Sequence, residues 1–220
     1  MALLDRRLVV VIGKGGVGKS TVTAALALAA VRAGKRVLVA EVNARERVSA
    51  LLGHRPVGEE IGPLEPGLDL VNVEPRAAMR EYALMILKFR SIYNAVFENR
   101  IVRYFLRAVP SLAQLVMLGK ILYHVDEKLP DGRPRWDLVL MDAPATGHGA
   151  MLLRLPQVLV ASMPPGPMVD EARKMHATLT DPKLTEGKKT WRIAKNSPAL
   201  KLGFVPHDWS QCGPRPKAKR

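Results

Sequence analysis

A glycine-rich run near the start of the chain constrains the fold more than any other feature of the sequence. Residues 13–21 read Gly-Lys-Gly-Gly-Val-Gly-Lys-Ser-Thr and match the pattern G-x-x-x-x-G-K-[ST]. The run follows an apolar, β-branched segment, Leu8–Ile12, and opens an Ala- and Leu-rich segment, Lys19–Ala33, that ends at Gly34. A strand, a glycine-rich turn and a helix in this order build a loop that cradles phosphate groups. The sequence therefore predicts a P-loop at the carboxyl end of a buried strand.

The loop residues have distinct expected roles. Glycines let the backbone curl so that successive N–H groups face an anion, and the N-terminus of the following helix adds partial positive charge. We expect Lys19 to reach the β- and γ-phosphates of ATP, the Ser20 hydroxyl to bind Mg²⁺, and Thr21 to lie near the α-phosphate. The candidate nucleotide-binding residues are Gly13, Gly15, Gly16, Val17, Gly18, Lys19, Ser20 and Thr21.

A second apolar run, residues 138–141, ends at Asp142. A buried strand that ends in an acid is what P-loop folds use to hold the Mg²⁺ shell, so Ser20 and Asp142 are the candidate metal ligands. The run continues as Asp-Ala-Pro-Ala-Thr-Gly-His-Gly to residue 149. The glycine that is flanked by polar residues within this run can move with the γ-phosphate. His148 taken alone is more typical of a surface histidine.

The remaining pattern predicts an α/β fold, a P-loop NTPase with a mostly parallel sheet flanked by helices. The expected strands are Leu8–Ile12, Arg36–Ala40, Leu68–Val73, Asp137–Met141 and Gln157–Ala161, with loops at 53–67 and 130–134. Residues 76–128 have helical periodicity, broken at Pro110 and resumed over Leu112–Val125, and form a predicted helical insert. Its apolar stripe can simply pack on the sheet, or Leu84, Met85 and Leu87 can form a second face for a partner or client.

Composition changes near residue 183. Residues 183–220 carry ten basic and two acidic residues within a chain whose net charge is +14. Without apolar periodicity this segment cannot offset its ordering entropy, so we expect a P-loop ATPase domain at 1–182 and an irregular or disordered basic tail at 183–220. Such a tail attracts nucleic acid nonspecifically, and no specific nucleic acid is expected as a partner.

Targeting features are lacking in the sequence. No apolar run approaches the roughly 18 residues of a membrane span, and the first residues lack the order of a signal peptide. The single cysteine, Cys212, cannot form an internal disulfide. The expectation is a cytoplasmic protein.

Lys14 narrows the class further. It gives the loop the form x-K-G-G-x-G-K-[ST], which resembles the deviant Walker A motif of dimeric P-loop ATPases. The run 142–148 with Leu-Leu-Arg-Leu-Pro at 152–156, and the run 73–82, are similar to signatures of the ArsA-type family. That family includes arsenite-pump motors and targeting factors for tail-anchored membrane proteins. The resemblance spans residues 7–182 and implies ATP with Mg²⁺ bound in a homodimer, in which Lys14 reaches the partner's phosphates.

The sequence also departs from that family. Asn43 stands where the first switch usually carries an aspartate; an amide can orient water but cannot take its proton, and Glu41 and Glu46 are the alternative carboxylates. The several cysteines of arsenite pumps and the zinc-binding C-x-x-C of targeting factors are absent. Residues 183–220 lack the family's further strands, so a truncated or frame-disrupted end and an incomplete sheet are expected.

The leading hypothesis is an ArsA-type, anion-transporting class of ATPase. Its catalytic residues would be Lys14, Lys19, Asn43 and Asp142, and ATP hydrolysis in a nucleotide-driven dimer would be coupled to a client or membrane partner through the helical insert. A partition or MinD-like positioning ATPase that uses its basic tail is one alternative. A non-hydrolysing nucleotide-binding fragment is the other, favoured by Asn43 and by the missing C-terminal elements.

Overall fold

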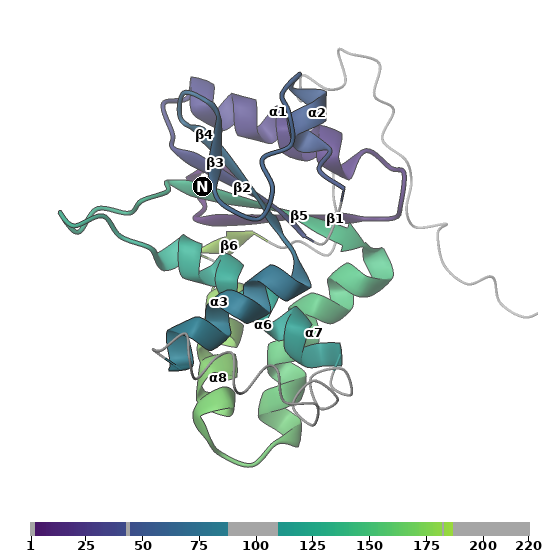
Figure 1. The fold of residues 1–220 in the computed structure, drawn as a ribbon, viewed down its shortest axis with the longest axis vertical. Helices are drawn as coiled ribbons and strands as arrows, with labels where there is room; N and C mark the ends of the chain where they lie inside the picture. Colours follow the sequence, from purple (N-terminus) through teal and green to yellow (C-terminus); the bar gives the residue numbers. More distant parts are fainter. Residues whose placement is uncertain (1–2, 43–44, 88–109, 182, 187–220) are drawn as a thin grey trace, which may run out of the picture. The chain divides into compact units, whose positions relative to one another are not determined.

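A six-stranded sheet is the centre of the fold (Figure 1). The computed structural model describes residues 3–42, 45–87, 110–181 and 183–186. Its strand order is β3-β4-β2-β5-β1-β6, and every neighbouring pair is parallel except β3 with β4. The strands are β1 (Leu8–Gly13), β2 (Val37–Val42), β3 (Gly62–Glu65), β4 (Leu68–Val73), β5 (Leu138–Ala145) and β6 (Thr185–Glu186). The predicted α/β class with a mostly parallel sheet is confirmed.

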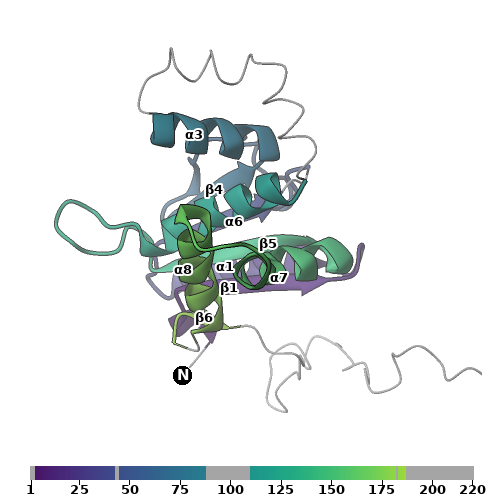
Figure 2. The same cartoon turned by 90° about the horizontal axis from the view of Figure 1, so that it is seen from below.

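Helices cover both faces of this sheet. The helices are α1 (Lys19–Arg32), α2 (Val48–Leu51), α3 (Pro75–Leu87), α6 (Pro110–Asp126), α7 (Thr146–Ser162) and α8 (Pro167–Thr180), after a short 3₁₀ turn at Leu3–Asp5. Figure 1 shows α1 and α2 on one side of the strands and α3, α6, α7 and α8 on the other, and Figure 2 shows this second group of helices from below, after a turn of 90°.

Two apolar clusters explain this layering. Successive side chains of a strand point to opposite faces, so Val9 packs in one cluster while Leu8 and Val10 pack in the other. The first cluster contains the small side chains of α1, Ala24, Ala27 and Ala30, which let the helix approach the sheet closely. The second is larger because α6 is buried around much of its circumference, as the buried run 115–118 shows. Buried strands of this kind are the near-continuous apolar runs that the sequence contains.

One predicted loop contains a strand. Residues 62–65 form β3, an antiparallel edge strand next to β4, within the segment predicted as the loop 53–67. Gly67, with a φ of 81°, makes the tight turn between the two strands. Pro63 hid the strand from sequence reasoning, because proline is tolerated in sheets mainly on an edge such as this one.

The predicted fifth strand is wrong. Residues 157–161 are the last turns of α7, not a strand. Leu152 and Leu155 are buried and Leu159 packs against the same cluster, a spacing of three and four residues that is helical. A short apolar run cannot distinguish a strand from a helix end by periodicity alone, and the helix continues through Pro156.

The helical insert is described only in part. The helices α3 and α6 contact each other and account for both ends of the predicted segment 76–128, with α6 beginning at the predicted Pro110. Residues 88–109 lie outside the described residues, and so do the side chains of residues 82–87. The predicted second apolar face at Leu84, Met85 and Leu87 therefore stays a prediction.

The sheet extends slightly past the predicted domain end. The carbonyl oxygen of Leu184 accepts hydrogen bonds from the backbone N–H groups of Arg7 and Leu8, and β6 then pairs with β1. The compact unit of the chain ends at Glu186, and residues 187–220 lie outside the described residues. None of the described helices has the length and apolar character that a bilayer crossing requires.

Candidate nucleotide-binding site

The glycine-rich loop joins β1 to α1 at the carboxyl edge of the sheet. Gly16 and Gly18 have φ values of 80° and 87°, in the left-handed region that other residues rarely adopt, and they turn the chain into the helix. A Cβ on Gly16 would meet open space, so its requirement is conformational rather than steric. The Lys19 ammonium donates a hydrogen bond of 3.2 Å to the carbonyl oxygen of Lys14, which folds the side chain back across the loop.

Asp142 lies directly beside this loop because β5 is the parallel neighbour of β1, with Val11 opposite Asp142. The Ser20 hydroxyl donates a hydrogen bond of 2.6 Å to Asp142 Oδ2, so the two predicted metal ligands are in contact. Asp142 is 6% exposed, and its Oδ1 is buried without a hydrogen-bond partner. Burial raises the pKa of this carboxyl, while the Ser20 hydroxyl and the charges of Lys19 and Arg47 oppose the shift.

These features fit a bound cation. A hydroxyl and a carboxylate are oxygen ligands of the kind that Mg²⁺ prefers, and it usually takes only one or two such protein ligands beside phosphate and water. The unpartnered Oδ1 of Asp142 is a buried acceptor that a cation or its water would satisfy. Ser20 and Asp142 are therefore the residues that could hold the ion.

A second buried carboxyl lies next to Asp142. Glu41 is opposite Asp142 in the β2–β5 register and is 0% exposed. Its Oε1 accepts hydrogen bonds from the backbone N–H groups of Arg47, at 2.9 Å, and Val48, at 3.3 Å, while its Oε2 is buried without a partner. Burial raises the pKa of Glu41 to about 7; the two N–H donors oppose the shift, and the charges of Asp142 and Glu46 add to it.

The other alternative carboxylate, Glu46, is already fully engaged. Its Oε2 accepts hydrogen bonds from the Ser49 hydroxyl at 3.1 Å and from the Val57 N–H at 2.6 Å, and its Oε1 accepts one from the Gly58 N–H. The side chain ties the segment after β2 to the loop that leads into β3. This bonding indicates a structural role, because each oxygen already accepts a hydrogen bond.

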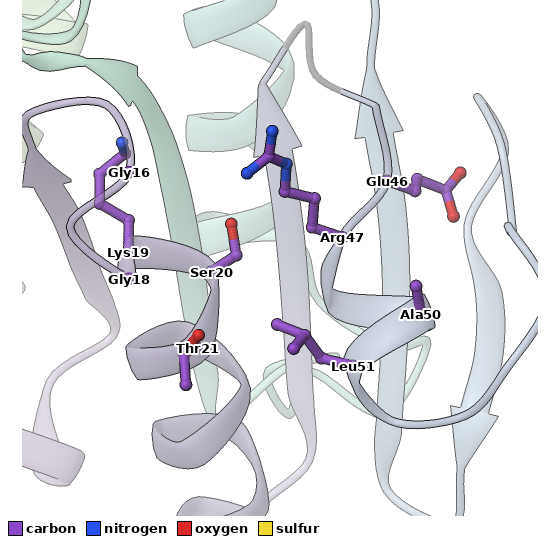
Figure 3. A pocket seen from close by; sticks show the side chains of 9 residues that line it. All are labelled: Gly16, Gly18, Lys19, Ser20, Thr21, Glu46, Arg47, Ala50 and Leu51. Atoms are coloured by element: carbon purple, nitrogen blue, oxygen red, sulfur yellow. The ribbon is translucent and has the colours of Figure 1, made fainter.

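The cavity of this site, about 470 Å³, lies between the phosphate loop and α2. Figure 3 shows the Arg47 side chain directed toward the space above Ser20 and the Lys19 side chain extending along the glycine-rich loop toward Gly16, whereas Glu46 points away. The lining residues are Gly16, Gly18, Lys19, Ser20, Thr21, Glu46, Arg47, Ala50 and Leu51. Sequence reasoning did not identify Arg47, Ala50 or Leu51. The only available signal was their position after a strand that ends at the same edge as the phosphate loop.

The structure describes some of the remaining predicted site residues and leaves out others. Lys14 is an exposed side chain on the loop, Gly15 and Val17 lie on the same loop, and Gly13 is the last residue of β1. Asn43 lies outside the described residues, and so does the side chain of His148, so their predicted roles stay predictions. Gly149 has a steric requirement instead: a Cβ there would lie 2.8 Å from the carbonyl oxygen of Pro144, where α7 begins against β5.

The fold and the loop define a P-loop nucleotide-binding protein. A family model for the anion-transporting ATPases, ArsA_ATPase, matches residues 6–189. The chain belongs to the anion-transporting ATPase family. This membership bears out the family resemblance of the two signatures and of the deviant loop.

Individual relatives agree with the family assignment. The chain is 32% identical over 152 residues to the ATPase BagA of Mycobacterium tuberculosis, and the matched region covers 67% of this chain and 45% of the relative. It is 24% identical over 148 residues to ATPase ASNA1 homolog 2 of Paramecium tetraurelia, covering 67% and 43%. It is 27% identical over 206 residues to the arsenical pump-driving ATPase of Escherichia coli, covering 84% and 34%. The chain thus spans less than half the length of these curated relatives.

Proposed function

We propose that this chain binds ATP with Mg²⁺ in the cavity between the phosphate loop and α2, and that it hydrolyses the γ-phosphate. The observation that carries the proposal is the hydrogen bond of 2.6 Å from the Ser20 hydroxyl to Asp142 Oδ2, which leaves the other carboxylate oxygen, Oδ1, buried and unpartnered beside a loop of left-handed glycines. Family membership supports the same reaction class.

Each residue has a part in this proposal. The loop N–H groups and the Lys19 ammonium bind the β- and γ-phosphates, and Thr21 lies toward the α-phosphate. Ser20 and Asp142 hold Mg²⁺, which supplies neutralisation of the phosphate charge when it is bound. Asn43 orients the attacking water through its amide, since Glu46 is occupied by three hydrogen-bond donors and Glu41 is completely buried.

The test is release of phosphate from Mg·ATP by the purified chain and by Asp142→Asn. Because the substitution removes the charge that holds the cation, we expect turnover to fall at least about 100-fold. The matched control is Asp131→Asn, on an exposed loop paired with Arg133, which should keep normal turnover. Equal phosphate release by all three proteins would come from a contaminant and would contradict the proposal.

We further propose that two copies form a nucleotide-driven dimer in which Lys14 of one copy reaches the phosphates of the other, and that hydrolysis is coupled to a client or membrane partner through the helical insert. The exposed position of Lys14 on the loop supports the first part. Light scattering with a non-hydrolysable ATP analogue tests it, with Lys14→Ala against Lys174→Ala, an exposed lysine on α8, as control. A wild-type chain that stays monomeric with the analogue bound would contradict the dimer.

A further inference from the structure

Arg47 is a second cation at the cavity, outside the glycine-rich motif. It lines the same space as Lys19 and Ser20 but comes from the segment between β2 and α2. Its side chain is exposed and directed toward the space above Ser20 (Figure 3). The site therefore has one positive group from the glycine-rich motif and a second from the segment after β2.

The backbone of Arg47 is fixed although its side chain is free to reach a ligand. Its N–H donates to Glu41 Oε1 at 2.9 Å, and Glu41 is completely buried in the central strand β2. The next N–H, of Val48, donates to the same oxygen at 3.3 Å. Two hydrogen bonds to one buried oxygen anchor the start of α2 to the sheet, so the anchor sets where the Arg47 side chain departs from the chain.

The guanidinium group is available for an anion. It has no hydrogen bond or ion pair with any residue of the described ranges, whereas Arg36, Arg133, Arg135 and Arg173 are all paired. Its positive charge opposes the rise that burial causes in the pKa of the Asp142 carboxyl, so the guanidinium group lies close enough to interact with the charge of that residue. A guanidinium presents a planar fork of donors that matches two phosphate oxygens.

We propose that Arg47 binds the terminal phosphate of a nucleoside triphosphate and that Glu41 is its positioning residue. The assignment to the terminal phosphate follows from the neighbours of Arg47. In P-loop proteins the metal ion binds oxygens of the β- and γ-phosphates. A guanidinium group beside the metal ligands Ser20 and Asp142 therefore faces the terminal end of the nucleotide and not the α-phosphate. This inference rests on the proposed nucleotide binding. It implies that the Arg47 side chain makes the site bind a nucleoside triphosphate more tightly than a diphosphate.

The test is calorimetry with a non-hydrolysable ATP analogue and with ADP, both with Mg²⁺, on wild type and Arg47→Gln. We expect the substitution to weaken analogue binding about tenfold, and ADP binding less than about twofold, because ADP lacks the phosphate that the guanidinium contacts. Arg45→Gln is the matched control, an exposed arginine two residues away that does not line the cavity, and it should leave both affinities unchanged.

The outcomes separate this inference from the proposed function. Wild type that binds neither nucleotide refutes nucleotide binding and this inference together. Wild type that binds both, with Arg47→Gln weakening both equally or neither, leaves nucleotide binding intact and overturns the terminal-phosphate role.

Glu41 is tested by the same ratio of affinities. Glu41→Ala removes the acceptor and should reduce the analogue-to-ADP preference as Arg47→Gln does. Glu41→Gln keeps a carbonyl oxygen for the two N–H donors and should restore most of that preference. If Glu41→Ala fails to fold, Glu41→Gln still decides, since loss of the preference in this conservative variant would show that the anchor alone does not position Arg47.

Discussion

Two neighbouring loops border the candidate site, and they are built by different means. The loop after β1 takes its shape from main-chain torsions at Gly16 and Gly18. The segment after β2 takes its shape from two glutamates, with Glu41 anchoring the start of α2 and Glu46 tying the segment to residues 57 and 58. The first loop depends on glycines, which can adopt left-handed torsions because they have no side chain. The second loop depends on hydrogen bonds to two carboxyl groups.

The first kind of loop is visible in a sequence and the second is not. A loop that needs left-handed torsions needs glycine at fixed spacing, so its pattern is visible in the sequence. A loop that is held by hydrogen bonds to a carboxylate needs only that acceptor at the right distance in space. The donors are backbone N–H groups, which every residue except proline supplies. Such a loop leaves no pattern in the sequence.

The largest predicted effect concerns the glutamate-built segment and pH. Burial raises the pKa of Glu41 to about 7 in the folded chain, against an ordinary value of 4.5, so the folded state binds more protons between these values. The free energy of unfolding should therefore fall as pH rises from about 4.5 to above 7, by about 3 kcal/mol from this group. Urea unfolding of the chain between pH 5 and pH 8, with EDTA and without nucleotide, measures this.

Glu41→Gln is the control for this prediction. The amide does not ionise, so the variant should lack the fall in unfolding free energy that Glu41 causes in wild type as pH rises. The unfolding free energy of the variant minus that of wild type should therefore increase with pH. The charged groups around Glu41 are Asp142, Glu46 and Arg47, and all three remain in the variant. Parallel pH curves for the two proteins would show that Glu41 ionises in the folded chain as it does in water.

Glu46→Gln should have the next largest effect. The substitution faces an NH₂ group toward N–H and O–H donors and removes charged hydrogen bonds, so we expect a loss of about 2 kcal/mol in unfolding free energy. Glu171→Gln on α8, whose partner is the exposed Lys174, should change stability by less than about 0.5 kcal/mol. Equal losses in the two variants would remove the distinction between the two ways of building a loop.

The glycine-built loop is tested by a pair of alanine substitutions. Gly16 and Gly34 have almost the same φ, 80° and 79°, and a Cβ would meet open space at both. Each substitution should therefore destabilise the chain by about 1 kcal/mol through the left-handed torsion. Only Gly16→Ala should also weaken ATP binding, because Gly34 ends α1 away from the site. Weakened binding in both variants would mean that general stability, and not loop shape, sets the affinity.

The sequence predicted most of the sheet and the better-known half of the site. The segments 8–12 and 68–73 became strands because almost all of their side chains are buried, and the glycine pattern identified the phosphate loop. Residues 157–161 were misassigned because a short apolar run fits a helix end as well as a strand. Arg47 was missed because only the register of β2 beside β5 places Glu41 next to Asp142, and the Glu41 carboxyl in turn holds the start of α2 at the cavity.

Calorimetry of Mg·ATP with wild type and Lys19→Ala measures whether the glycine-built loop binds the phosphates of ATP. The variant removes the ammonium that lies across the loop, with Lys174→Ala as the control for loss of a lysine. We predict that ATP affinity falls at least about tenfold in Lys19→Ala, about 1.4 kcal/mol or more, and stays unchanged in the control. Equal ATP affinity in wild type and Lys19→Ala would contradict the account.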